Sequence, residues 1–242
     1  MRRFTLPASV AIVLAAAGCS WSRADAEERD AGPKVSRNYQ VGEFSKIEVA
    51  GPYEVKVVTG GAPGVAARGG ANLLDETEVV VDGDTLEIRP KKRKGFHWSW
   101  SNGTAEFTVN VAALRAAAIA GSGGISIDKV SGDFEGDVAG SGDLRLPSVT
   151  GGTLKLAIAG SGDVMAAGKA DRVDISIAGS GDIDAKGLVS RTADVSIAGS
   201  GGVAAHATET ADVSIMGSGD VELSGGAKCK VSKMGSGNVH CS

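Results

Sequence analysis

The tripeptide Gly-Ser-Gly recurs seven times in the second half of this chain at nearly constant spacing. Successive copies are 18 to 20 residues apart, and their first glycines are Gly121, Gly140, Gly160, Gly179, Gly199, Gly217 and Gly235. A fixed period of this length is typical of repeat architectures, in which each repeat packs mainly against its neighbours. The repeat therefore constrains the fold more than any other feature of the sequence.

Apolar residues occupy every second position on both sides of each corner. Ile175 and Ile177 precede one corner, and Ile183 and Ala185 follow it. This alternation predicts two short strands per repeat, each with one buried face. We therefore expect a single-domain, all-β parallel β-helix, a solenoid with about 18–20 residues per coil and about nine or ten coils stacked at roughly 4.8 Å. Glycine suits the corners because it adopts positive φ and lets neighbouring coils approach closely.

The alternative fold is a β-sandwich, because sandwiches also carry turn signals every 8 to 12 residues. A sandwich does not require identical corners at a fixed period, whereas stacked coils do. The period therefore favours the β-helix.

The N-terminus has the organisation of an export signal. Two arginines are followed by an apolar run and then by Ala16-Ala17-Gly18-Cys19, which resembles the lipobox of bacterial lipoproteins. We expect residues 1–18 to be a signal peptide and Cys19 to be the lipidated N-terminus of the mature protein. Cleavage after Ala26, which would discard Cys19, is the alternative.

The composition of residues 19–38 is polar and charged, which is typical of a flexible tether. We expect the β-helix domain to cover residues 39–242. The expected partner of the lipid is a membrane, and the expected location is the cell envelope, at the outer membrane or on its periplasmic side. The formal net charge of −4 disfavours nucleic-acid binding.

Two cysteines remain if Cys19 carries a lipid. Cys229 lies six residues before Gly235 and Cys241 six residues after it. Exported proteins with two cysteines usually pair them. We therefore predict a Cys229–Cys241 disulfide that closes the last coil, where Lys233 replaces the isoleucine of earlier coils and provides a polar end.

The sequence resembles the putative auto-transporter adhesin, head GIN domain family over about 200 residues. The resemblance rests on Phe44-x-x-Ile47-x-Val49-x-Gly51-x-Tyr53-x-Val55-x-Val57, Asn72-Leu73-Leu74, Gly83-x-x-Leu86-x-Ile88, Val109-x-Val111-x-x-Leu114 and the Gly-Ser-Gly repeats. It implies a parallel β-helix and an adhesin-like role in the bacterial envelope. It implies no catalytic or ligand-binding residue.

Rows of polar residues offer alternatives that involve metal binding or catalysis. One row follows the corners (Asp143, Asp163, Asp182, Asp220 and Asn238) and is either a calcium ladder or a set of turn caps. A second row, Asp174, Asp194 and Asp212 between Lys155 and Lys230, could serve a carbohydrate-active enzyme, but the aromatics that stack on sugars are missing from this half. The corner serines lack the setting of a hydrolase nucleophile. We predict no enzyme, no metal site and no cofactor.

The segment from Lys91 to Gly103 is the most basic and aromatic part of the chain. Its candidate binding residues are Lys91, Lys92, Arg93, Lys94, Phe96, Trp98 and Trp100. Such a loop could contact anionic lipid or glycan, or it could instead cover the N-terminal end of the solenoid.

The function expected from the sequence is that of a non-catalytic, membrane-tethered envelope β-helix that acts as a binding, adhesion or spacer module. An envelope protein or polysaccharide is the expected partner. A carbohydrate-active enzyme on the Asp194 face and a purely structural lipoprotein are the alternatives.

Overall fold

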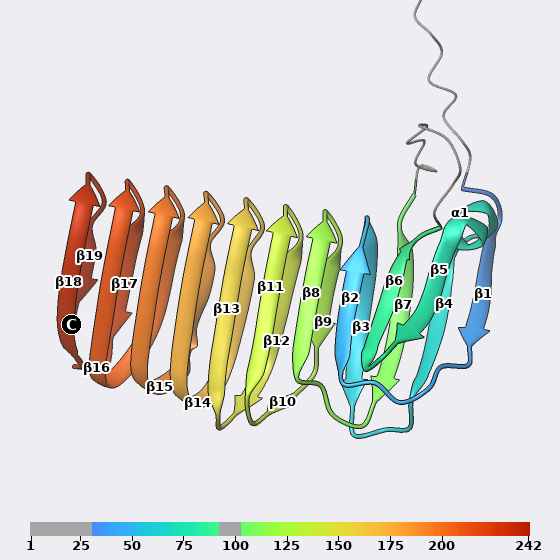
Figure 1. The fold of residues 1–242 in the computed structure, drawn as a ribbon, viewed down its shortest axis with the longest axis horizontal. Helices are drawn as coiled ribbons and strands as arrows, with labels where there is room; N and C mark the ends of the chain where they lie inside the picture. Colours follow the sequence, from blue (N-terminus) through green and yellow to red (C-terminus); the bar gives the residue numbers. More distant parts are fainter. Residues whose placement is uncertain (1–30, 92–102) are drawn as a thin grey trace, which may run out of the picture.

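The computed structural model describes residues 31–91 and 103–242. Nearly all of this part is β-structure, and the strands stack side by side along one long axis (Figure 1). The prediction of a parallel β-helix is confirmed.

The repeats form the regular part of the stack. Three of its strands, β14, β15 and β16, are long because they continue through the bend between one coil and the next. The strands are β8 (Ala116–Gly121), β9 (Gly124–Ile127), β10 (Val130–Ser131), β11 (Phe134–Gly140), β12 (Asp143–Thr150), β13 (Thr153–Gly160), β14 (Val164–Gly179), β15 (Ile183–Gly199), β16 (Gly202–Gly217), β17 (Asp220–Ser224), β18 (Lys228–Gly235) and β19 (Val239–Cys241).

Successive coils pair in parallel and place equivalent residues side by side. Ile177 pairs with Ile158 in the preceding coil and with Ile197 in the following one, and all three side chains are buried. The same register continues to Ile215. The core is therefore a set of aliphatic ladders, and the sandwich alternative is wrong because the strands from β8 onward pair in parallel between coils.

The corners explain the repeated glycines. Gly179 has a φ of 139°, and a Cβ atom placed there would lie 2.1 Å from the carbonyl oxygen of Gly160 in the preceding coil. A Cβ at Gly181 would lie 2.2 Å from the carbonyl oxygen of Gly162. The Ser180 N–H donates to the Gly160 carbonyl oxygen at 2.8 Å. The close stacking of corner on corner therefore excludes any side chain at both glycine positions.

The N-terminal part does not follow the simple repeat. Its elements are β1 (Lys34–Tyr39), β2 (Lys46–Ala50), β3 (Tyr53–Thr59), β4 (Gly64–Gly70), α1 (Ala71–Glu76), β5 (Thr77–Asp82), β6 (Thr85–Pro90) and β7 (Ala105–Val111). Strand β2 lies between β6 and β8, and β3 lies between β7 and β9, so the stacking order differs from the chain order. Strands β1, β4 and β5 add antiparallel pairings.

This arrangement corrects the expected number of coils. The solenoid has about seven turns rather than nine or ten, because much of the N-terminal part forms antiparallel strands and a helix instead of further regular coils. All of strand β1 except Tyr39 also lies within the segment expected to be a tether, residues 19–38. Its apolar residues Val35 and Tyr39 pack against the core, a contact that its polar composition did not indicate.

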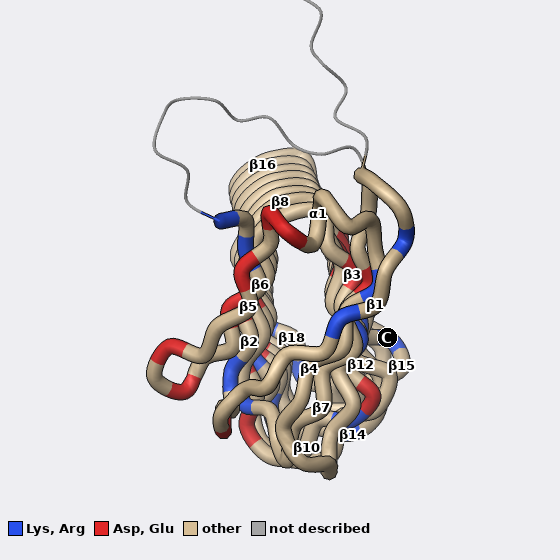
Figure 2. The backbone as a smooth tube through the Cα atoms, turned by 90° about the vertical axis from the view of Figure 1, so that its right-hand side faces the viewer, with Lys and Arg blue, Asp and Glu red and all other residues tan. Residues whose placement is uncertain are grey.

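Viewed along the solenoid axis, the coils lie one behind another, and the Gly-Ser-Gly corners form an uncharged ridge at the top (Figure 2). Most buried aromatic residues of the described chain lie in the N-terminal part (Phe44, Tyr53 and Phe107), whereas Phe134 lies in β11. Tyr53 and Phe107 pack edge to face with ring centroids 5.4 Å apart. The Tyr53 hydroxyl lies 3.0 Å from the buried Thr77 Oγ1, and burial raises the pKa of Tyr53.

Candidate functional site

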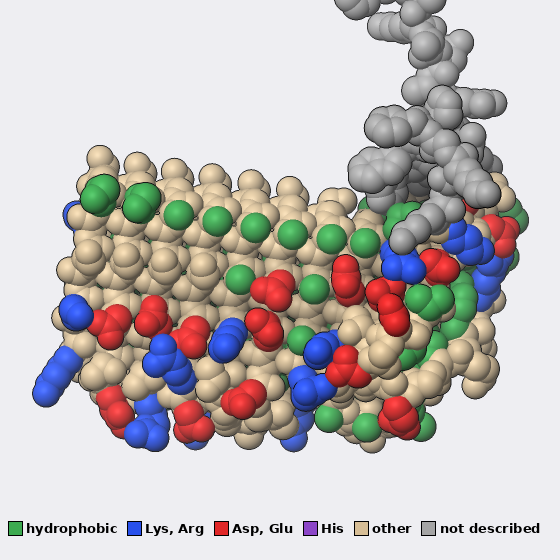
Figure 3. All heavy atoms as spheres, viewed as in Figure 1, with side chains coloured by type: hydrophobic (Ala, Val, Ile, Leu, Met, Phe, Trp, Pro, Cys, Tyr) green, Lys and Arg blue, Asp and Glu red, His purple; other side chains and the backbone are tan. Residues whose placement is uncertain are grey.

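A regular surface is formed by the outward side of the strands that precede the corners, here called the outer face (Figure 3). Parallel pairing in register aligns its side chains into three rows that run along the solenoid. The row next to the corners is Ala50, Ala120, Ala139, Ala159, Ala178, Ala198, Met216 and Met234. The middle row is Glu48, Ala118, Asp137, Ala157, Ser176, Ser196, Ser214 and Ser232, and the outer row is Lys46, Ala116, Glu135, Lys155, Asp174, Asp194, Asp212 and Lys230.

The outer face combines small neutral side chains with a charged border. The first two rows are mostly alanine and serine, which leaves the backbone close to the surface, whereas the third row carries charges of both signs. Such a surface is largely flat, because most side chains of the first two rows are short. It can contact a partner over several coils at once.

The Asp174 row is partly neutralised inside this face. Arg172 Nε lies 2.5 Å from Asp174 Oδ1, and its Nη2 lies 3.6 Å from Asp194 Oδ2. These residues line a shallow depression of about 410 Å³ together with Glu135 and Asp137. Burial, followed by the neighbouring Glu135, raises the pKa of Asp137. Among the described residues, no aromatic or histidine side chain lines this depression, and sugar-stacking aromatics are what the enzyme alternative requires.

The aspartates that follow the corners accept hydrogen bonds between coils. Asp163 Oδ1 accepts from the Asp182 N–H at 3.2 Å, and Asp182 Oδ1 accepts from the Gly202 N–H at 2.6 Å. Asp220 Oδ1 accepts from the N–H of Asn238 at 2.8 Å. The interpretation of Asp163, Asp182 and Asp220 as caps within their own turns is thus corrected, because each of these three reaches the next coil. Asp143 instead accepts from Arg145 on its own strand.

Metal binding has no support in this row. The described part of the chain contains no group of three or more His, Cys, Asp or Glu side chains that could hold a metal ion.

One histidine of the described chain belongs to a polar cluster with serines outside the corners. His206 Nδ1 lies 3.0 Å from Ser224 Oγ, at the bend opposite the corners. Ser190 Oγ donates to the His206 carbonyl oxygen at 2.8 Å. This polar cluster was not anticipated, because only the three-dimensional register brings its members together.

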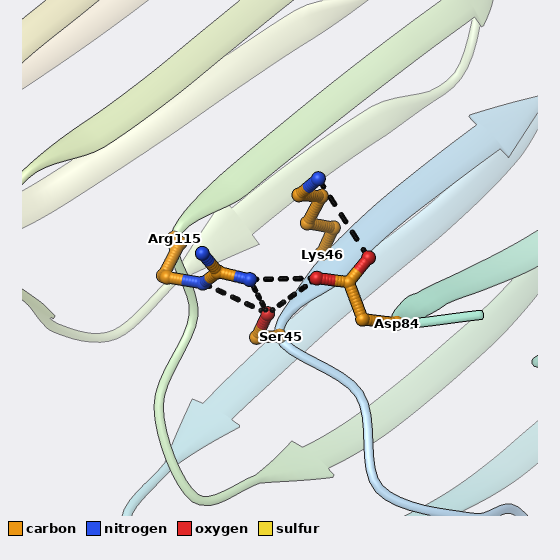
Figure 4. Close-up of polar contacts among 4 residues, drawn as sticks. All are labelled: Ser45, Lys46, Asp84 and Arg115. Carbon is orange, nitrogen blue, oxygen red and sulfur yellow. Dashed lines mark hydrogen bonds and ion pairs between the residues drawn. The ribbon is translucent and has the colours of Figure 1, made fainter.

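A second unanticipated cluster joins three layers near the N-terminal end (Figure 4). Arg115 Nη2 lies 2.6 Å from Asp84 Oδ2 and 2.7 Å from Ser45 Oγ, and Lys46 Nζ lies 3.6 Å from Asp84 Oδ1. Desolvation raises the pKa of Asp84, but Lys46, Ser45 and Arg115 together outweigh it, and the pKa is lowered overall. The cluster ties the layers of β6, β2 and β8, which are distant in sequence.

Of the candidate binding residues in the predicted basic and aromatic loop, only Lys91 lies within the described residues. The Lys91 N–H donates to the Glu76 carbonyl oxygen at 2.8 Å, and Lys91 Nζ donates to the Asp75 carbonyl oxygen at 2.7 Å. Lys91 is therefore engaged at the end of α1. The other candidate residues lie outside the described residues, as does the lipidation candidate: Lys92, Arg93, Lys94, Phe96, Trp98, Trp100 and Cys19.

The last coil contains the disulfide between Cys229 and Cys241 that the sequence predicts. Cys229 belongs to β18 and Cys241 to β19, so the bond links the two strands of the end coil. Lys233 occupies the register position of Ile215, and its Nζ donates to the Gly237 carbonyl oxygen at 2.8 Å.

These features define a parallel β-solenoid with a long, flat outer face. The chain belongs to the family described as putative auto-transporter adhesin, head GIN domain, whose model matches residues 43–227. The resemblance identified from the sequence is thereby confirmed.

Two solved bacterial structures illustrate the similarity. A putative lipid binding protein from Parabacteroides distasonis is 28% identical, with a TM-score of 0.72 over 87% of this chain and 97% of the other. A putative adhesin from Bacteroides fragilis shares the fold at 23% identity, with a TM-score of 0.75 over 86% of this chain and 97% of the other. No curated protein matches the chain.

Proposed function

We propose that this protein is an exported, lipid-anchored adhesion module that binds an envelope protein or polysaccharide through its outer face. The family and its structural relatives support a non-catalytic binding or adhesion role. The observation that carries the proposal is the register of the outer face, which repeats the same small and neutral side chains over successive coils.

The expected anchoring depends on Cys19. No helix in residues 31–91 or 103–242 is long and apolar enough to cross a membrane. The lipobox-like sequence supports attachment through a lipid, and the adhesin-like family supports an envelope location. The polar residues that follow Cys19 would place the solenoid at a distance from the membrane.

A photo-crosslinking experiment in intact bacterial cells tests the outer face. A crosslinking residue replaces Ala178 in full-length protein, and a matched control carries it at Asp184, which is exposed on the strand after the corner. We expect one reproducible adduct from position 178 and none from position 184. The substitution Ala198→Arg, one coil away on the same row, should abolish that adduct. Equal labelling from both positions, or no effect of the arginine, would refute binding through the outer face.

Contact with a lipid surface is a second candidate function. It is favoured by the four consecutive cations and three aromatic residues of the Lys91 to Gly103 segment, and by the name of the lipid binding relative. Cosedimentation of lipid-free protein with vesicles containing anionic phospholipid tests it. A Trp98→Ala, Trp100→Ala variant should lose binding, whereas unchanged binding would exclude this segment as the contact.

A further inference from the structure

The C-terminal end of the solenoid is an open sheet edge. Strand β18 pairs with β16 on one side, and β19 pairs with β17. Within the described chain, neither strand has a pairing partner on its other side. The backbone donors and acceptors of this edge are therefore available for another strand.

Apolar side chains that are covered in earlier coils are exposed at this edge. Val231 is 47% exposed, whereas its counterparts Val213 and Val195 in the two preceding coils are 3% and 0% exposed. On the outer face near the corner of the same end, Met234 and Met216 are exposed where the earlier coils have alanine. Methionine is flexible and adapts to differently shaped partners. One additional strand would bury Val231 and contact Met234.

The charge of the edge specifies the partner. Three exposed lysines, Lys228, Lys230 and Lys233, lie on β18, and the chain has no aspartate or glutamate after Glu222. Lys228 and Lys230 form no ion pair with any described residue, although Lys230 adjoins Asp212 in the ladder. Lys233 points inward, at a position that is isoleucine one coil earlier. A strand added here must therefore offer carboxylates.

The same charges disfavour a second copy of this protein as the partner. Two C-terminal ends that faced each other would bring both sets of lysines together, and like charges in direct opposition destabilise strand pairing. An inward-pointing charge such as Lys233 also discourages the addition of a strand that offers it no carboxylate, and β18 of a second copy offers none.

We propose that the free edge of β18 captures an extended acidic segment of another polypeptide by strand addition. In this mode, main-chain hydrogen bonds provide affinity and alternate side chains provide specificity. Carboxylates of the incoming segment pair with Lys228 and Lys230, and the apolar residue that follows the second carboxylate covers Val231. The interaction uses the end of the rod and is independent of binding through the outer face.

Synthetic peptides of the length of β18, eight residues, test the proposal with full-length protein. The acidic peptide alternates valine with glutamate, a basic peptide replaces each glutamate by lysine, and a third peptide is the acidic one with a central proline. Fluorescence anisotropy should show binding of the acidic peptide only, because proline removes a main-chain donor and disrupts strand pairing.

A charge reversal distinguishes this edge from other basic sites. The double substitution Lys228→Glu, Lys230→Glu should weaken the acidic peptide at least about tenfold and allow the basic peptide to bind. Lys155→Glu, at the same row position in the interior strand β13, should change neither affinity. Recovery of binding by the basic peptide shows that the double variant is folded.

Three results would overturn the proposal. They are failure of the acidic peptide to bind the wild-type protein, equal binding of the proline peptide, and loss of binding in Lys155→Glu. Sedimentation could instead show a dimer of this protein. If the acidic peptide does not dissociate that dimer and the double substitution Lys228→Glu, Lys230→Glu disrupts it, the edge is assigned to a second copy.

Discussion

Stacking of the Gly-Ser-Gly corners predicts an unusually large cost for adding a single methyl group at Gly179. Alanine there must adopt a φ of 139°, and its Cβ would lie 2.1 Å from the Gly160 carbonyl oxygen. Backbone strain of this kind costs about 1–3 kcal/mol. Relief of the clash would also break the hydrogen bond from the Ser180 N–H to that carbonyl oxygen, and an unsatisfied group costs about 1–3 kcal/mol more. We expect Gly179→Ala to lower the free energy of unfolding by about 2–6 kcal/mol.

Gly151 provides a matched control within the same chain. It also has a positive φ, 71°, but a Cβ atom there meets nothing within 4 Å. Gly151→Ala should therefore cost only the left-handed backbone term, about 1–2 kcal/mol. Urea unfolding followed by far-ultraviolet circular dichroism measures both variants. A cost for Gly179→Ala no greater than that for Gly151→Ala would refute the reasoning, because it would show that contact between coils does not require glycine at the corner.

Three further perturbations test other parts of the structure. Replacing Cys229 and Cys241 by serine removes a cross-link with a sequence separation of 12 residues, which should destabilise the end coil by about 3 kcal/mol. Hydrogen exchange should accelerate in β18 and β19 but not in β14. Uniform acceleration would contradict a local role of the disulfide. The pKa of Asp84 is lowered in the folded protein, so the stability that its carboxylate contributes is present above the unfolded pKa and is lost as the pH falls through the folded pKa. The free energy of unfolding measured below about pH 5 should therefore depend less on pH in Asp84→Asn than in the wild type. Identical pH profiles would exclude a contribution of this carboxylate to stability. Finally, Cys19→Ser should release the protein from the membrane fraction of cells, and retention there would disprove the lipid anchor.

Several features could be predicted from the sequence because equivalent residues stack directly on one another. A corner that tolerates only glycine must recur whenever a new coil is added, so the spacing of Gly121, Gly140 and the later copies reveals a solenoid. Inward positions must be apolar in every coil for the same reason. The pairing of Cys229 with Cys241 is also local, since both residues belong to the last coil.

Only the tertiary structure decided which distant segments lie together. Strands β2 and β3 insert between layers that come later in the chain, and Ser45 thereby meets Arg115, 70 residues away. The alternation of apolar and polar residues along a strand is the same whichever neighbour the strand pairs with. The sequence pattern therefore cannot specify the order in which the strands stack. The same limit applies to Asp182, whose polar character was evident but whose acceptor role depends on Gly202 in the next coil. Local patterns thus determine the strands and corners of this protein, whereas hydrogen bonds between layers and packing of side chains distant in sequence determine how its layers are ordered.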